Sequence, residues 1–197
     1  MGERRNREEH RRAREFEAFV AGAAGRLLHA ATLLTGEVFG AAPAAQQLLV
    51  DALARTYADW DRLRGEDPYE HTRHDLACHF AHAAWRYRRP RGGLLDALSP
   101  QERLMLMLRM YEGVAEEQVA AALGLPVERV RELCTRGMAS VLSRASNPAN
   151  PSGAPGGDGA GGQGGAVHAA EHGLSRLVTG IRHLGRAGAG RDKEGVA

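Results

Sequence analysis

The chain has 197 residues, of which 43% are hydrophobic, and its formal net charge is +2. This length accommodates one ordinary domain or two small ones, and the hydrophobic content is sufficient for a packed core. Two cysteines are too few for a disulfide framework and indicate a reducing compartment. No apolar run of about 20 residues and no apolar signal core is evident, so we expect a cytoplasmic protein that does not associate with a membrane.

The first half of the chain predicts three helices. Residues 1–14 are mostly charged and are interpreted as a tail or a frayed helix start. Apolar residues then recur at three- and four-residue steps from Phe16 to Leu34. A second helix is expected to begin near Pro43, and a third at Pro68, because proline is favoured in a first helical turn. Strand-like alternation is absent, so the expected fold class is all-α.

The second half predicts a helix-turn-helix. Ser99 and Glu102 form a capping-box pattern at the start of one helix. A short helix over residues 116–123, a tight turn at 124–126 and a helix over 127–142 follow. The second helix of such a pair enters the major groove in DNA-binding proteins, but ordinary helical bundles contain the same pairs, so both interpretations stay open. The residues expected to interlock the pair are Val119, Ala122, Leu125, Val130, Cys134, Met138 and Val141.

The end of the chain has a different composition. Residues 147–165 are rich in Asn, Pro, Ser and Gly, which is typical of a disordered linker. An amphipathic segment and a tail are expected over residues 166–197.

Metal and enzyme chemistry find little support in the sequence. One face of the third helix carries residues with the spacing of paired zinc ligands, namely His71, His74, Cys78 and His82. No second cluster completes a four-ligand site, so we expect neither a metal nor another cofactor. A phosphate-binding glycine loop followed by lysine is absent, as is a nucleophile motif, so we expect no enzymatic activity.

Several short segments together resemble the extracytoplasmic-function sigma factors, two-domain members of the sigma-70 family. The resemblance covers residues 15–145 and implies a region 2-like domain at 15–90, a linker at 91–98 and a region 4-like helix-turn-helix domain at 99–146. The segments are EFEAFV (15–20), LLHAATLLTG (27–36), DALARTYADW (51–60), LSPQER (98–103), MYEG (110–113) and AEEQVAAALG (115–124).

The resemblance implies transcription initiation with two partners, core RNA polymerase and promoter DNA, and control by an anti-sigma factor or another regulatory protein. The implied polymerase-binding residues are Leu48, Leu49, Asp51 and Arg55. Separated DNA strands would meet Trp85, Arg86, Tyr87, Arg88 and Arg89, because aromatic rings beside cations hold single strands. Alternatively, Trp85 and Tyr87 complete the core and the arginines form a solvated helix end. The implied contacts to duplex DNA are Arg129, Arg131, Glu132, Thr135 and Arg136.

The chain departs from the family at two places, which supports an alternative function. Gln46 and Gln47 stand where the family has an acidic pair in its clamp-binding helix, and Val50 replaces a polar residue. Glu132 inserts a carboxylate into the recognition helix, where it either accepts a hydrogen bond from cytosine or repels phosphates. The alternative is an accessory transcription regulator or interaction module that has lost promoter initiation.

Overall fold

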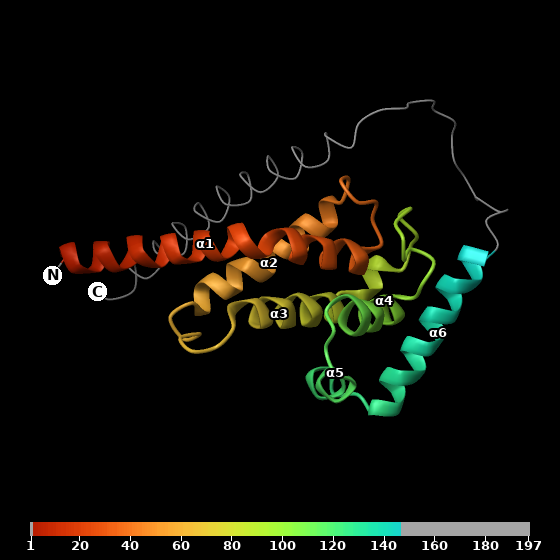
Figure 1. The fold of residues 1–197 in the computed structure, drawn as a ribbon. Helices are drawn as coiled ribbons and strands as arrows, with labels where there is room; N and C mark the ends of the chain where they lie inside the picture. The colour runs from red at the N-terminus through yellow and green to blue at the C-terminus, as the bar shows by residue number, and fades with distance from the viewer. Residues whose placement is uncertain (1, 147–197) are drawn as a thin grey trace, which may run out of the picture.

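The computed structural model describes residues 2–146, and within this range the chain is all-helical, as the sequence predicts (Figure 1). Isolated backbone bridges join Glu37 to the segment at Arg91 and Gly92. The segments expected at 147–165 and 166–197 lie outside the described residues. The helical elements are α1 (Gly2–Thr35), α2 (Pro43–Asp59), α3 (Pro68–His82), a 3-10 turn (Ala84–Tyr87), α4 (Pro100–Leu106), a π-helical turn (Met107–Tyr111), α5 (Glu116–Leu123) and α6 (Val127–Ser146).

The charged N-terminal residues form the first turns of α1 (Figure 1). Pairs of opposite charge at (i, i+4) support this exposed part, for example Arg7 with Glu3 at 3.6 Å. The later part of α1 is, by length and composition, apolar enough to cross a membrane, with a mean hydropathy of 1.3 over a window of 18 residues. Half of that window is buried inside the protein.

The helix starts follow the local signals in the sequence. Asp67 accepts a hydrogen bond from the backbone N–H of Tyr69 at the start of α3. Ser99 and Glu102 form the expected capping box at the start of α4. The start of α2 has a partner that the sequence does not reveal, because the carboxylate of Glu37 accepts from the backbone N–H of Ala45 at 2.9 Å.

Two hydrophobic clusters hold the helices together. One lies between α1 and α2 and includes Phe16, Val20 and Leu53. The larger cluster joins the first three helices to the second half of the chain, since Leu34 and Phe80 share it with Met107 and others. The segment at 91–98, which we predict to be a linker between two domains, therefore connects parts that share a core.

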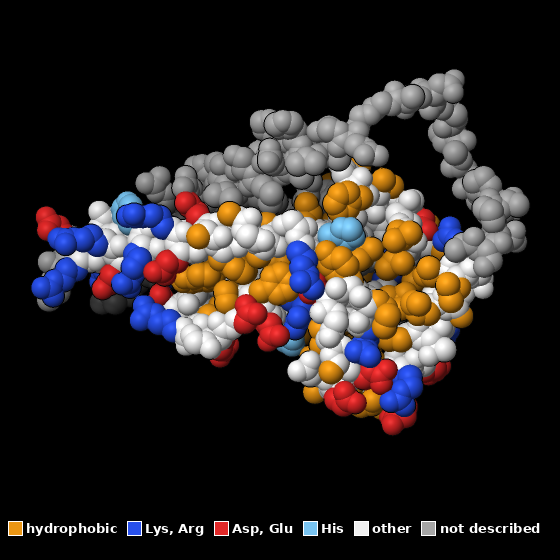
Figure 2. Space-filling view, viewed as in Figure 1, with side chains coloured by type: hydrophobic (Ala, Val, Ile, Leu, Met, Phe, Trp, Pro, Cys, Tyr) orange, Lys and Arg blue, Asp and Glu red, His pale blue; other side chains and the backbone are white. Residues whose placement is uncertain are grey.

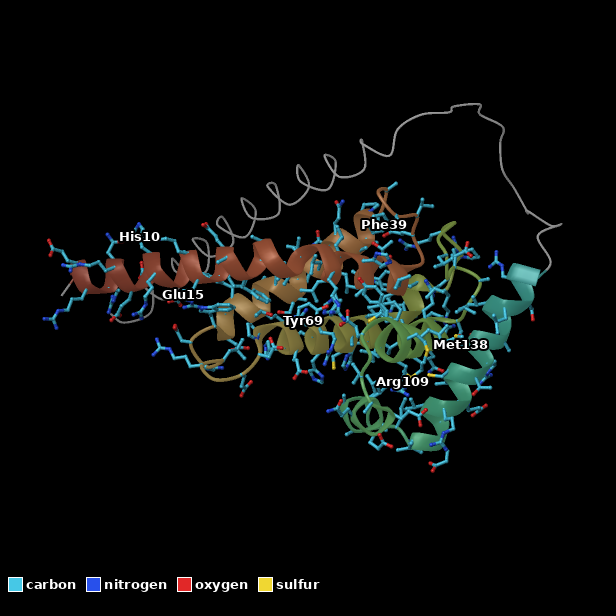
Figure 3. The ribbon with its side chains drawn as sticks, in the orientation of Figure 1. His10, Glu15, Phe39, Tyr69, Arg109 and Met138 are labelled. Carbon is cyan, nitrogen blue, oxygen red and sulfur yellow. The ribbon has the colours of Figure 1, made fainter. Side chains whose placement is uncertain are left out.

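Polar contacts also join the first three helices to the second half of the chain. Glu112, whose side chain is fully buried, accepts a hydrogen bond from the hydroxyl of Tyr69 at 2.9 Å and pairs with Arg26 at 3.3 Å. Tyr69 projects from the start of α3 (Figure 3). Arg103 of α4 is completely buried and donates to the backbone carbonyl of Tyr87. Its Nε and Nη1 atoms are buried without a hydrogen-bond partner among the described residues, and burial lowers the pKa of its guanidinium.

Candidate nucleic-acid interface

Helices α5 and α6 form the helix-turn-helix that the sequence predicts. Gly124 ends α5 in the left-handed conformation, with a φ of +63°, and the backbone N–H of Leu125 donates to the carbonyl of Ala120 at 2.9 Å. This turn directs the chain into α6 at Val127 after three residues. The two helices and α4 thus place one face of α6 inward and leave the opposite face open.

The inward face of α6 differs from the expected one. Val130 and Cys134 are buried as predicted, but Leu133 is also buried, whereas Met138 is 38% exposed. Ala122 of α5 is exposed as well. The reason is that α6 packs on α4 through Gly137, where an added Cβ would approach Leu106 to 3.2 Å. This contact brings Leu133 and Gly137 to the centre of the interface and turns Met138 away.

The outward face of α6 carries the predicted DNA-binding residues, and its charges are mixed. Glu132 pairs with Arg129 at 2.7 Å and with Arg136 at 3.0 Å. Arg136 also lies 3.4 Å from Glu102 of α4. The hydroxyl of Thr135 donates to the backbone carbonyl of Arg131. In Figure 2, acidic and basic side chains alternate over the ends of α5 and α6 rather than forming a continuous basic surface.

Glu116 of α5 links the elements around this face. Its carboxylate pairs with Arg131 of α6 at 3.0 Å and with Arg109 of the π-helical turn at 3.6 Å. Arg109, labelled in Figure 3, also donates to the backbone carbonyl of Val114. Sequence reasoning missed Glu116 and Arg109. The signal for Glu116 is an acidic residue in the first turn of a helix, but that pattern alone only suggests a contact with the helix dipole.

The aromatic and basic segment at residues 85–89 is partly exposed and partly buried in the core. Trp85 is 66% exposed, and the guanidinium of Arg86 lies over its ring. Arg88 and Arg89 are exposed. Tyr87 corrects our expectation, because it is buried and stacks on Phe80 with ring centroids 5.1 Å apart. Burial raises the pKa of Tyr87. Only Trp85 of the two rings is therefore open to stack on a base.

The expected polymerase-binding surface on α2 also needs correction. Leu48 and Leu49 are buried, with exposed fractions of 2% and 0%, so they do not form an exterior surface. The reason is that α2 packs against both α1 and α3, which buries two stripes instead of one. Arg55 is exposed and Asp51 is partly exposed, and both lie close to His79 of α3.

The histidine-rich face of α3 brings two of its residues together. Cys78 Sγ lies 3.5 Å from His74 Nε2, while the ring of His82 contacts the Cys78 carbonyl. Burial raises the pKa of the Cys78 thiol. Within residues 2–146, no three His, Cys, Asp or Glu side chains are grouped to hold a metal ion.

Comparison with known protein families identifies one part of the chain. Residues 94–141 match the family model described as sigma-70, region 4. No curated protein and no solved structure matches the chain. The match begins before α4 and ends within α6, so it contains α5, the turn and the part of α6 that carries the outward residues. The chain therefore contains a sigma-70 region 4 domain, which is a DNA-binding module of transcription and not a catalytic domain.

Proposed function

We propose that this chain is a sigma factor-like transcription initiation protein that binds core RNA polymerase and promoter DNA in the cytoplasm. The observation that carries the proposal is the coincidence of the region 4 match with a well-formed helix-turn-helix. The second helix presents Arg131, Glu132 and Arg136 to solvent, which is the arrangement needed to reach base edges and phosphates.

The exposed aromatic and basic residues at 85–89, in the first half of the chain, also support promoter binding. Trp85 and the exposed arginines at 86, 88 and 89 combine a free ring with positive charge. Such a combination holds single-stranded nucleic acid by stacking and electrostatic attraction. We assign this segment to the separated strands of the promoter and α6 to the duplex upstream. The extracytoplasmic-function subtype is part of this proposal.

The polymerase contact is the step to test first. We assign it to the exposed part of α2 around Asp51 and Arg55, since Leu48 and Leu49 belong to the core. The full chain is mixed with core RNA polymerase, and association and promoter-specific transcripts are measured. The double variant Asp51→Ala/Arg55→Ala should weaken association at unchanged stability.

A matched control is available in the ion pair between Asp59, the last residue of α2, and Arg62 just beyond the helix. Asp59→Ala/Arg62→Ala removes the same two charges and should leave polymerase association unchanged. If the wild-type chain shows no association with core polymerase, initiation is excluded.

A second candidate function has its own supporting observation. Every candidate arginine of α6 is paired with a carboxylate in the structure, and α2 offers few exposed side chains for the clamp. An accessory regulator that binds another protein through region 4 fits these features. It predicts that the chain binds a regulatory protein, such as an anti-sigma factor, while giving no transcript with core polymerase.

A further inference from the structure

Glu132 occupies a distinctive place on the outward face of α6. It lies within the first two turns of the helix, on the same stripe as Glu128 and Thr135. Arg129, one turn before, and Arg136, one turn after, both reach its carboxylate, at 2.7 Å and 3.0 Å. The carboxylate is thus held between two guanidinium groups at the part of the second helix that contacts base edges in helix-turn-helix proteins.

The two arginines change what this carboxylate does near DNA. The hydrogen bond from Arg129 lowers the pKa of Glu132, so the group is ionised at neutral pH. Its negative charge is compensated by two positive charges nearby, which reduces the repulsion that a lone carboxylate would exert on phosphates. Arg136 is further fixed by Glu102 of α4, so the arrangement is anchored to the body of the domain.

An ionised carboxylate only accepts hydrogen bonds, and this restricts the bases that it reads. In the major groove the donors are the N4 amino group of cytosine and the N6 amino group of adenine. Adenine places its N7 acceptor beside the N6 donor, and N7 and a carboxylate oxygen of Glu132, both acceptors, would repel each other. Cytosine presents its amino group without that neighbour, so it is the better partner for Glu132.

We infer that Glu132 is a specificity-determining residue that reads a cytosine in the major groove, with Arg129 and Arg136 holding its carboxylate in position. This inference rests on the proposed function, since it requires α6 to enter the groove. Of the two roles that the sequence leaves open for Glu132, base recognition is favoured, because the two arginines compensate its charge and weaken its repulsion of the DNA phosphates.

Substitution by glutamine gives a sharp test, because the amide offers one acceptor and one donor. Glutamine forms a two-bond contact with adenine N6 and N7. Glu132→Gln should therefore move the preferred base at one position from cytosine to adenine. At that position wild type should prefer cytosine over the other bases by about tenfold in affinity, and Glu132→Ala should abolish this preference. It should also free both arginines for phosphates, which steepens the salt dependence of non-specific binding.

The experiment is selection of duplex DNA from a randomised library by the full chain, alone and with core RNA polymerase. Wild type, Glu132→Gln and Glu132→Ala are compared with Glu117→Gln, a matched control that makes the same change at an exposed carboxylate of α5. Glu117→Gln should select the wild-type sequence. Affinities for the selected site and its single-base variants are then measured at two salt concentrations.

The outcomes separate this inference from the proposed function. If both Glu132 variants select the wild-type sequence with the same discrimination at every position, Glu132 is not a specificity residue, while the proposed function stands. Glu132 is likewise excluded from base recognition if Glu132→Ala tightens binding to all sequences and keeps the cytosine preference. If the wild-type chain selects no sequence under either condition, the inference and the proposed function both fail.

Discussion

The contact between Tyr69 and Glu112 should make a measurable contribution to stability, because it joins α3 to the region 4 domain. The Glu112 side chain is fully buried, and the hydroxyl of Tyr69 lies 2.9 Å and 3.1 Å from its two oxygens. A hydrogen bond to a charged group contributes about 1.5–3 kcal/mol. Arg26 is more than half exposed, so its pairing with Glu112 adds at most about 1 kcal/mol.

We therefore expect Tyr69→Phe to lower the free energy of unfolding by about 2 kcal/mol. Chemical denaturation of wild type, Tyr69→Phe, Glu112→Gln and the double variant measures the coupling between the two residues. The loss in the double variant should be smaller than the sum of the single losses by about 1 kcal/mol or more. Tyr57→Phe, in the aromatic cluster with Phe16, is the control and should change stability by less than about 0.5 kcal/mol.

The same contact predicts a pH dependence. Burial, followed by the hydrogen bond to Glu112, raises the pKa of Tyr69 above its usual value. In the unfolded chain this hydroxyl titrates at about pH 10. The stabilisation is complete below that pH and is lost as the pH rises toward the higher pKa of the folded state. Stability should therefore fall more steeply above about pH 10 in wild type than in Tyr69→Phe. Equal slopes, or additive losses in the double variant, would refute the assigned contact.

Three further predictions concern packing and are tested by denaturation. Leu49→Ala should cost about 2–5 kcal/mol, whereas Arg55→Ala on the exposed side of α2 should change stability by less than about 0.5 kcal/mol; equal effects would contradict the burial of Leu49. Arg103→Met removes buried unpaired N–H groups at similar volume but also the hydrogen bond to the Tyr87 carbonyl, so stability should change by less than about 1 kcal/mol, and a loss above about 3 kcal/mol would show that the guanidinium has further partners. Gly124→Ala should cost about 1–2 kcal/mol through its positive φ, and an unchanged stability would mean that the turn adopts another conformation.

Features governed by short stretches of sequence could be predicted without the structure. The caps at Asp67 and Ser99 act within three residues, and the bounds of α5 follow from Gly124 and the apolar spacing. The outward position of Arg131 and Glu132 also follows from helical periodicity, since the opposite side carries Val130 and Cys134.

Features that depend on packing could not be predicted in the same way. The resemblance that implies Leu48 and Leu49 as polymerase-binding residues does not reveal that α2 is covered by both α1 and α3, which buries these two side chains. Trp85 and Tyr87 are both amphipathic aromatics, and only the contact with Phe80 decides which one is buried. Glu37 caps α2 from outside the helix, at a distance of eight residues from Ala45, beyond the range of local capping patterns.

The π-helical turn at Met107–Tyr111 bears on how this chain should be aligned with others. The backbone N–H of Glu112 bonds to the carbonyl of Met107, five residues back, so the helix contains one residue more than a regular α-helix would at this point. Successive residues of an α-helix are rotated by about 100° around the helix axis. Because Glu112 already lies one turn beyond Met107, deleting the exposed Met110 would restore regular winding and keep Glu112 on the side of Tyr69 and Arg26. An alignment with a regular helix that opens no gap here would equate side chains that point in different directions, and the carboxylate partner of the half-buried Tyr69 would be assigned to a neighbouring residue.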